Sequence, residues 1–324
     1  MTDDDGLAYA WLLDGSGSGR QLSWDELHTG SPAEGILWVH LDATHPEAVR
    51  WLREESGLDA ISVEALLEEE TRPRIIAAKD ALLLILRGVN CNPGSDPDDM
   101  VALRMWVEEH WVISMRRRRI LAMKDMNEKI IAGKGPNNVG EFLAIVSHGI
   151  IDRMGDVVSD IDDRVDELED SVLTEESHEL RPKLAAVRRQ VISLRRYISP
   201  QRDVMARIHH ERVPWIGEMH RLQLRETAER TARFVEDLDA ARDRAAITQE
   251  ELNSRLAEQM NKTMYVLSIV AAIFLPLGLV TGLLGINVGG IPGSENPSAF
   301  IAVCVFLVAL AAVQFWTFRR MRWV

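Results

Sequence analysis

The feature that most constrains this chain is a stretch of 32 residues, Thr263–Ser294, that contains no charged side chain. Within it, Met264–Leu284 is an apolar run of 21 residues, and a second uncharged run, Ala299–Phe318, adds 20 more. At about 1.5 Å of rise per residue, each run as a helix spans the roughly 30 Å of a bilayer's hydrocarbon core. A single run of this kind can be a buried core helix, but two in tandem predict a hairpin of two transmembrane helices.

The charges that flank these runs predict how the hairpin is oriented. Lys262 precedes the first run, whereas the connection Gly285–Ser298 carries only Glu295. Three arginines follow the second run, namely Arg319, Arg320 and Arg322. Because basic residues collect on the cytoplasmic side, we expect both termini in the cytoplasm and the connection outside.

The rest of the chain has the composition of a reduced, cytoplasmic region with an acidic start. The N-terminus lacks a basic segment followed by an apolar one, so it does not resemble a signal peptide. Cys91 and Cys304 lie too far apart in the sequence to indicate a disulfide framework or a zinc–thiolate cluster. Residues 1–110 hold 22 Asp and Glu against 8 Lys and Arg. This surplus argues against nucleic-acid binding and favours a protein that attracts cations.

The part before the spans is predicted to be an α/β domain followed by long helices. Two short helices are expected at His45–Ser56 and Ile61–Glu70, the second capped by Ser62. Strand patterns occur at Leu7–Asp14, Ile36–Asp42, Ile75–Asn90 and Val101–Met115. We therefore divide the chain into an α/β cytoplasmic domain (1–136), a long-helix stalk (137–262) and a transmembrane domain (263–324). The last comprises the first span (264–284), the outer loop (285–298), the second span (299–318) and a basic cytoplasmic tail (319–324).

Heptad spacing predicts a coiled coil in the stalk. Its seam residues are Ile151, Met154, Val158, Ile161, Val165, Leu168 and Val172. A second long helix, Leu180–His210, is expected to bend at Pro200, and a third covers Thr227–Asn261. No Gly or Pro interrupts Glu226–Leu275. The third helix is therefore predicted to continue into the first span as one helix, which would couple the cytoplasmic part to the membrane.

The outward faces of the first long helix are crowded with carboxylates. Six of them are Asp156, Asp160, Asp163, Asp166, Glu167 and Asp170. Such oxygen ligands suit divalent cations, so a cytoplasmic metal site is one interpretation. A solvated helix face is the other and the one we favour, with arginines of the second long helix as partners.

The first span carries small residues along one side. Met264, Ser268, Ala271, Leu275, Gly278 and Gly282 follow one another at spacings of three and four residues, so they share one face. If several chains place this face on a common axis, it lines a narrow and weakly polar path; the alternative is a packing seam of a dimer. Pro276 leaves one backbone carbonyl of the span without its usual partner. The second span, with Gln314, has the composition of a lipid-facing helix.

Signals of catalysis are absent from the sequence. It contains no phosphate-binding loop, nucleophile elbow or dinucleotide fingerprint, so we expect no enzyme and no cofactor. The basic segment Arg116–Arg119 is expected to pair with acidic neighbours rather than to bind a nucleotide or a lipid headgroup. Trp215 and His220 are expected to be buried where the second and third long helices meet.

The tripeptide Gly285-Ile286-Asn287 directly follows the first span. It resembles the Gly-Met-Asn signature of the CorA family of divalent-cation transporters, with Ile286 in place of the usual Met. The segment Val266–Asn287 is similar to that family's pore helix, and the order of acidic α/β domain, long helices, two C-terminal spans and basic tail is similar to its overall plan. The glycine-rich segment that follows, Val288–Gly293, resembles the ZntB branch of zinc transporters.

The resemblance implies a CorA-like funnel, a homopentamer in the bacterial inner membrane, and Zn²⁺ as the transported ion. The first span would be the pore helix, with Gly285, Ile286 and Asn287 at its outer mouth. Five Asn287 amide oxygens around an axis suit a hydrated dication, because they can bind its waters without removing them. The residues implied to face the lumen are Asn261, Met264, Ser268, Ala271, Leu275, Gly278 and Gly282, with Met264 and Leu275 as apolar constrictions.

Two rival functions follow from the same residues. A channel of the same family for Mg²⁺, Co²⁺ or Ni²⁺ is one, because recognition of a hydrated ion discriminates weakly among dications. A membrane-anchored coiled-coil sensor or scaffold that conducts nothing is the other. Neither span contains Asp, Glu, Lys or His, so neither provides a proton carrier.

Overall fold

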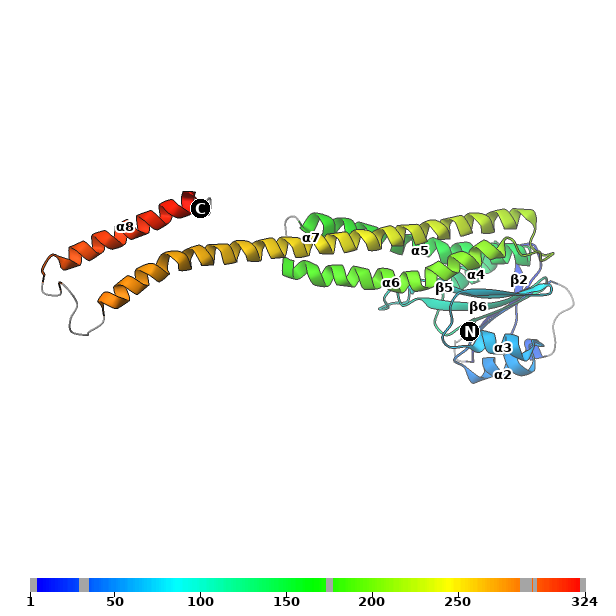
Figure 1. The fold of residues 1–324 in the computed structure, drawn as a ribbon. Helices are drawn as coiled ribbons and strands as arrows, with labels where there is room; N and C mark the ends of the chain where they lie inside the picture. The colour runs from blue at the N-terminus through cyan, green and yellow to red at the C-terminus, as the bar shows by residue number, and fades with distance from the viewer. Residues whose placement is uncertain (1–4, 29–34, 173–176, 286–292, 294–295, 321–324) are drawn as a thin grey trace. The chain divides into compact units, whose positions relative to one another are not determined.

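The structure is a computed structural model that describes residues 5–28, 35–172, 177–285, 293 and 296–320. The chain divides into two compact units, Met1–Gln249 and Glu250–Val324. The first unit contains a mixed sheet (Figure 1). Its seven strands lie in the order β2-β1-β3-β7-β6-β5-β4. Its strands are β1 (Leu7–Leu13), β2 (Gly19–Gln21), β3 (Ile36–Asp42), β4 (Arg74–Ala78), β5 (Ala81–Gly88), β6 (Val101–Glu108) and β7 (Trp111–Arg116).

Two of the predicted strands are in fact hairpins. The segment expected as one strand from Ile75 contains β4 and β5, which pair antiparallel across a turn at Lys79 and Asp80. Lys79 has a φ of 52°, the left-handed conformation that such a tight turn requires. The segment from Val101 likewise contains β6 and β7. Periodicity alone misses both turns because neither contains Gly, Asn or Pro.

Helices cover both faces of the sheet, which makes the first unit a three-layer α/β domain. On one face lie α1 (Trp24–His28), α2 (Pro46–Glu54) and α3 (Ala60–Leu67). On the other lie α4 (Leu121–Ile131), α5 (Val139–Val172) and α6 (Ser177–Ile208) (Figure 1). Because both faces are covered, every residue of β5 is buried. The α/β prediction is confirmed, although the N-cap of α3 is Asp59, which accepts from the Ile61 and Ser62 amides, and not Ser62.

The predicted coiled-coil seam of α5 is confirmed, because all seven of its residues are at most 6% exposed. The third long helix, α7 (Glu218–Leu284), is a single helix of 67 residues. This helix is longer than the segment Glu226–Leu275 that the sequence predicted to be uninterrupted, and it continues into the first span as predicted. The buried residues of α7 include Leu238, Ala241, Ala245 and Leu252, whose spacing of three, four and seven residues defines a seam on this helix as well. Met260 is 65% exposed, so the seam ends before that residue.

A glutamine fixes α6 to the sheet. Opposite β5, β4 begins at Arg74, which pairs with Ile85, so no β4 residue lies opposite Arg87. The fully buried side chain of Gln201 takes that place: its Oε1 accepts from the Arg87 amide at 2.6 Å, and its Nε2 donates to the Arg87 carbonyl at 2.9 Å. Gln201 thereby completes the ladder of a buried strand. Helix α6 continues through the neighbouring Pro200.

We expect Gln201→Leu to destabilise the first unit by about 2–4 kcal/mol, because it leaves a buried amide and a buried carbonyl of Arg87 unsatisfied. Thermal unfolding of the detergent-solubilised full chain, followed by tryptophan fluorescence, measures the loss. The matched control is Gln223→Leu, since Gln223 is exposed on α7. Equal stability of the two variants would contradict this role for Gln201.

Candidate functional site

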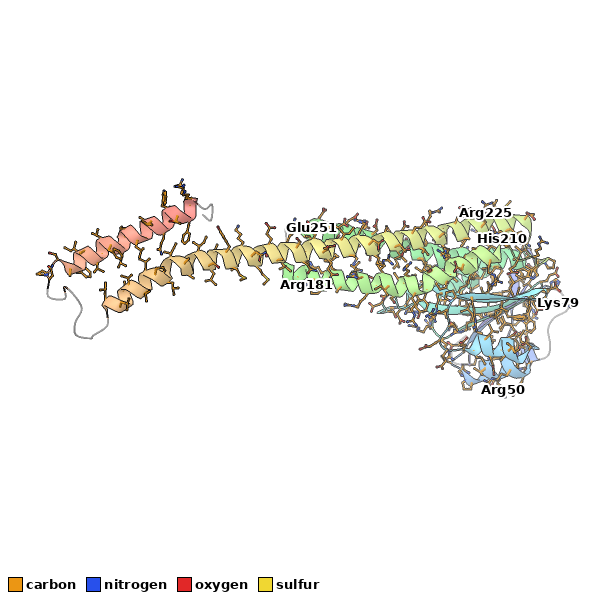
Figure 2. All side chains as sticks on the ribbon, in the orientation of Figure 1. Arg50, Lys79, Arg181, His210, Arg225 and Glu251 are labelled. Carbon is orange, nitrogen blue, oxygen red and sulfur yellow. The ribbon has the colours of Figure 1, made fainter. Side chains whose placement is uncertain are left out.

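Two helices of the described residues are long and apolar enough to cross a membrane, α7 and α8 (Ala299–Arg320). No residue of either apolar window is buried. Side chains project from both helices along these windows (Figure 2). The hydrophobic surface of these segments is therefore covered by something other than this chain, as expected for helices in a bilayer.

Within the second unit, α8 packs against one side of α7. On α7 the half-buried residues include Ile269, Ala272, Ile273, Pro276 and Val280. On α8 they include residues spaced three or four apart, at Val303, Leu307, Leu310, Gln314 and Thr317. The Nε2 of Gln314 donates to the carbonyl of Ala272 at 3.4 Å. Gln314 therefore faces α7, whereas large apolar residues of α8 such as Phe300, Val308 and Val313 are exposed, as predicted for a lipid-facing helix.

The predicted lumen-facing residues lie on a different side of α7. Asn261, Met264, Ser268, Ala271, Leu275, Gly278 and Gly282 are all described, and all seven are exposed. At 3.6 residues per turn, most of this face points away from the side that contacts α8. An open, apolar groove lies here, lined by Ala271, Phe274, Leu275, Pro276, Gly278 and Leu279. A Cβ atom added to Gly278 or Gly282 would meet nothing within 4 Å.

The polarity of this face comes from backbone and hydroxyl oxygens. Ser268 Oγ donates to the Met264 carbonyl at 2.8 Å. Thr281 lies about 100° around the helix from Gly282, at the edge of this face, and its hydroxyl donates to the Leu277 carbonyl at 3.0 Å. Both hydroxyl protons are therefore used within the helix, which leaves oxygen lone pairs as acceptors. A surface with acceptors and no charge suits contact with the waters of a hydrated cation better than direct ligation.

Of the predicted mouth, the structure describes Gly285, whereas Ile286 and Asn287 lie outside the described residues. The amide of Gly285 donates to the Thr281 carbonyl at 2.9 Å and so closes the last turn of α7. A Cβ atom at residue 285 would lie 3.1 Å from that carbonyl oxygen. Glycine therefore fits here because a side chain would crowd the last turn of the helix.

The six predicted cytoplasmic ligands are exposed along α5. Within the described residues, no group of three or more His, Cys, Asp or Glu side chains is placed to hold a metal ion. Arg244 of α7 instead contacts three carboxylates of α5: Asp162 at 2.8 Å, Glu169 at 2.6 Å, and Asp166. The hydrogen bonds that Arg244 donates to Glu169 and Asp166 raise the pKa of its guanidinium above the usual range. The cation that balances these three carboxylates is thus an arginine of the third long helix, whereas the sequence predicted arginines of the second.

We expect Arg244→Gln to weaken the contact between α5 and α7 by about 1 kcal/mol, because three carboxylates then lie together without their cation. Thermal unfolding in low salt measures this loss. At 1 M salt, where the Debye length is about 3 Å, the difference from wild type shrinks. The control is Arg225→Gln, whose side chain pairs with Glu229 on its own helix. A loss in Arg244→Gln that is independent of salt would contradict the electrostatic account.

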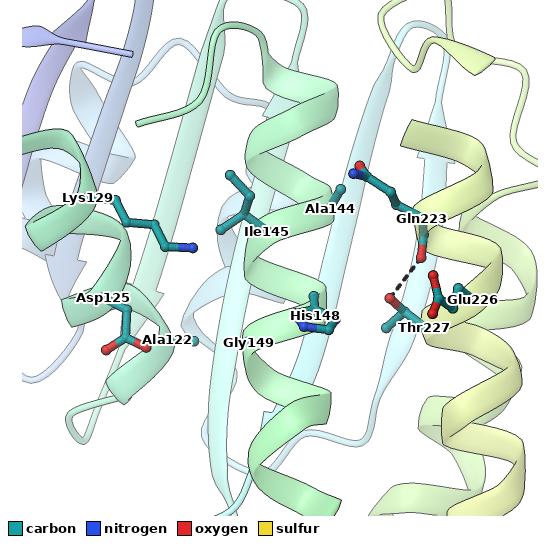
Figure 3. Close-up of a pocket in the computed structure, with 10 residues that line it drawn as sticks. All are labelled: Ala122, Asp125, Lys129, Ala144, Ile145, His148, Gly149, Gln223, Glu226 and Thr227. Carbon is teal, nitrogen blue, oxygen red and sulfur yellow. Dashed lines mark hydrogen bonds between the residues drawn. The ribbon is translucent and has the colours of Figure 1, made fainter. Parts of the chain in front are cut away.

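A cavity of about 280 Å³ lies between α4, α5 and α7 (Figure 3). Its titratable lining residues are Asp125, Lys129, His148 and Glu226. Asp125 pairs with Arg153 on α5. This cavity brings charges of both signs together without assembling a metal-ligand group among the described side chains.

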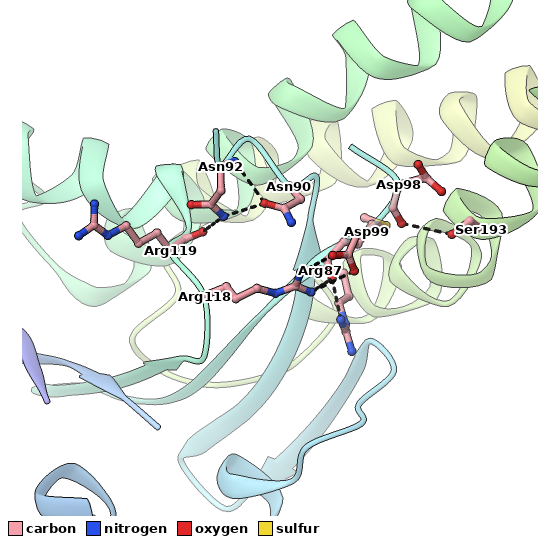
Figure 4. A network of polar contacts seen from close by, with 9 residues as sticks. Arg87, Asn90, Asn92, Asp98, Asp99, Arg118, Arg119 and Ser193 are labelled. Atoms are coloured by element: carbon pink, nitrogen blue, oxygen red, sulfur yellow. Dashed lines mark hydrogen bonds and ion pairs between the residues drawn. The ribbon is translucent and has the colours of Figure 1, made fainter. Parts of the chain in front are cut away.

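Three arginines of the basic segment that begins at the last residue of β7 pair with acidic neighbours, as predicted. Arg116 lies 3.5 Å from Asp42, and Arg117 lies 3.2 Å from Glu69. Figure 4 shows Arg118 paired with Asp99. The hydrogen bond to Arg118 lowers the pKa of the Asp99 carboxyl.

The junction between α6 and α7 holds the two residues expected there. Trp215 is buried as predicted, and its Nε1 donates to the Asp80 carbonyl at 2.8 Å. His220 is half-buried rather than buried, because it lies in the first turn of α7. A Cβ atom at Gly140 would lie 2.8 Å from its Nδ1, so the start of α7 packs closely on the start of α5.

Comparisons with known proteins place these features in a family. Residues 33–320 match the family model described as CorA-like Mg2+ transporter protein. The chain is 40% identical to the divalent cation transporter CmaX of Pseudomonas aeruginosa, over 99% of this chain and 98% of the relative. It is 35% identical to the zinc transport protein ZntB of Yersinia enterocolitica, over 98% and 95%. A solved structure of full-length CmaX is 40% identical and covers 99% of both chains with a TM-score of 0.85.

A three-layer α/β unit followed by long helices and two apolar C-terminal spans defines a helical membrane protein with a large extramembrane part. With a family model matched over most of the sequence and full-length relatives above 30% identity, the chain belongs to the CorA-like family. The resemblance seen in the Gly-Ile-Asn motif and the order of domains is thereby confirmed.

Proposed function

We propose that this chain is a divalent-cation transporter that moves hydrated Zn²⁺ through a pore formed by α7 helices of several subunits. The observation that carries the proposal is the uncharged, open face of α7 at Ser268, Ala271, Leu275, Gly278 and Gly282, in a chain of the CorA-like family. Because α8 covers another side of the same helix, this face is free to meet copies of itself around an axis.

The assembly we propose is a homopentamer in the bacterial inner membrane with both termini in the cytoplasm. Basic residues before the apolar part of α7 and at the end of α8 support that orientation. The acidic N-terminal region would then raise the local concentration of cations at the cytoplasmic side. Native mass spectrometry of the detergent-solubilised protein tests the number of subunits.

The selectivity site we propose is a ring of Asn287 side chains at the outer mouth, next to Gly285 and Ile286. Zinc as cargo is supported by the relative named zinc transport protein. Magnesium is the second candidate, because the family model is described as a Mg2+ transporter and another relative as a divalent cation transporter. Amide oxygens that bind the hydration shell would pass either ion, so the outer mouth alone does not separate the two.

Metal uptake by liposomes that contain the purified protein tests this function. Zinc-sensitive and magnesium-sensitive dyes are trapped inside, and protein-free liposomes are the control. Zinc influx with little magnesium influx supports the proposal, and repeating it with a pH gradient shows whether protons are coupled. Magnesium influx of equal or greater size would instead favour a magnesium channel. Absence of both zinc influx and magnesium influx would favour the interpretation as a non-conducting scaffold.

A further inference from the structure

Pro276 leaves one backbone acceptor of the first span without its ordinary donor. A proline has no N–H, so it cannot donate to the carbonyl four residues earlier, which belongs to Ala272. Ala272 lies inside the apolar segment, where no water is available to replace the bond. An unsatisfied carbonyl in hydrocarbon costs free energy, so such a helix is stable only if another group supplies the donor.

The structure supplies that donor from the other helix. Gln314 is the only residue of either predicted span, 264–284 or 299–318, with a side-chain amide. Its Nε2 donates to the Ala272 carbonyl, 42 residues away in the sequence. The nearby hydroxyls donate elsewhere, since Ser268 bonds to Met264 and Thr281 bonds to Leu277. The one side-chain amide in the two spans therefore donates to the backbone carbonyl that Pro276 leaves without a donor.

The bond to Ala272 determines the orientation of the glutamine amide. Its Oε1 is shielded from solvent and has no hydrogen-bond partner among the described residues. Only the amide nitrogen can donate to a carbonyl, so the Ala272 bond also fixes which way the amide is turned. The side chain lies on the half-buried side of α8 rather than on its exposed side.

We propose that Gln314 is a positioning residue of the transport pathway: it caps the carbonyl released by Pro276 and so holds the conformation of α7 around this proline. Leu275 and Ala271 flank this bond on the exposed face. A helix whose carbonyl is uncapped can bend or admit water at this level, which would move both side chains relative to the axis. The inference rests on the proposed transport function, but the hydrogen bond can be tested without it.

The test is a double-mutant cycle between Gln314→Leu and Pro276→Ala in the full-length protein, read out by unfolding temperature in detergent and by zinc uptake in liposomes. Gln314→Leu keeps the approximate size of the side chain and removes the donor. Pro276→Ala restores an N–H for Ala272. Thr317→Val is the matched control on α8, because the Thr317 hydroxyl donates to Val313 within its own helix.

We expect Gln314→Leu alone to lower the unfolding temperature by about 2–4 °C and to reduce zinc uptake severalfold. In the Pro276→Ala background, the same change should have little effect on either quantity, whereas Thr317→Val should be mild in both backgrounds. A Gln314→Leu effect of equal size in both backgrounds would overturn the proposal, as would no effect on the native sequence. If no variant and no wild-type protein transported metal, the proposed function would fail, but the thermal cycle would still decide whether the bond exists.

Discussion

Asn287→Ala is expected to reduce metal uptake in liposomes below about one-tenth of the wild-type value while the oligomer stays intact. Asn287 follows the last turn of α7, which Gly285 closes by its bond to Thr281. In the proposed pore, the side chain supplies the polar oxygens that replace bulk water around an entering dication. Alanine removes these oxygens from every subunit at once, so the entering ion loses all of its amide contacts and uptake falls strongly.

Asn296→Ala is the matched control for this prediction. Asn296 lies in the same connection, where its side chain accepts from the Ser298 amide ahead of α8. Its loss removes an amide from the outer loop without touching the proposed mouth, so uptake should stay near that of the wild type. Size-exclusion chromatography tests whether both variants keep the wild-type assembly, which we expect them to do. Undiminished uptake by Asn287→Ala would refute the assignment of the mouth.

The large features of this fold could be predicted from the sequence because each depends on a residue pattern that extends over many consecutive residues. The coiled-coil seam from Ile151 to Val172 repeats over many turns, so its burial could be predicted. The continuity of α7 follows from the absence of Gly and Pro over a long segment. The hairpin turn at Lys79 could not be predicted in the same way, since Asp80 is its one turn-favouring residue and no Gly, Asn or Pro stands beside it.

Contacts between distant residues are the part that the sequence could not provide. Nothing in the spacing of the acidic residues on α5 indicates that Arg244 of α7 is their partner. The Gln314 contact had a partial signal, because Pro276 predicts a free carbonyl and Gln314 is the one amide in the spans. Whether Gln314 lies beside the Ala272 carbonyl depends on the axial register of α8 along α7, and only the three-dimensional structure gives that register.

Two neighbouring residues of α7 are expected to differ in how a thiol reagent affects transport. Ala271→Cys, in a background with Cys91→Ser and Cys304→Ser, should become sensitive to a water-soluble thiol reagent, with uptake falling at least about tenfold. Val270→Cys should be much less affected. Both residues are exposed in the single chain, yet successive helical residues point about 100° apart, so only Ala271 shares the face of Leu275 and Gly278.

This pair separates a water-filled path from a packing seam, the two interpretations that the small residues allow. A conducting lumen exposes the thiol introduced by Ala271→Cys to the reagent in each subunit, and the attached group then obstructs the path. In a dry packing seam the reagent cannot reach this thiol, so uptake would not change. Stronger inhibition of Val270→Cys than of Ala271→Cys would place the lumen on the neighbouring face of α7 and would require the lining residues to be reassigned by about one position.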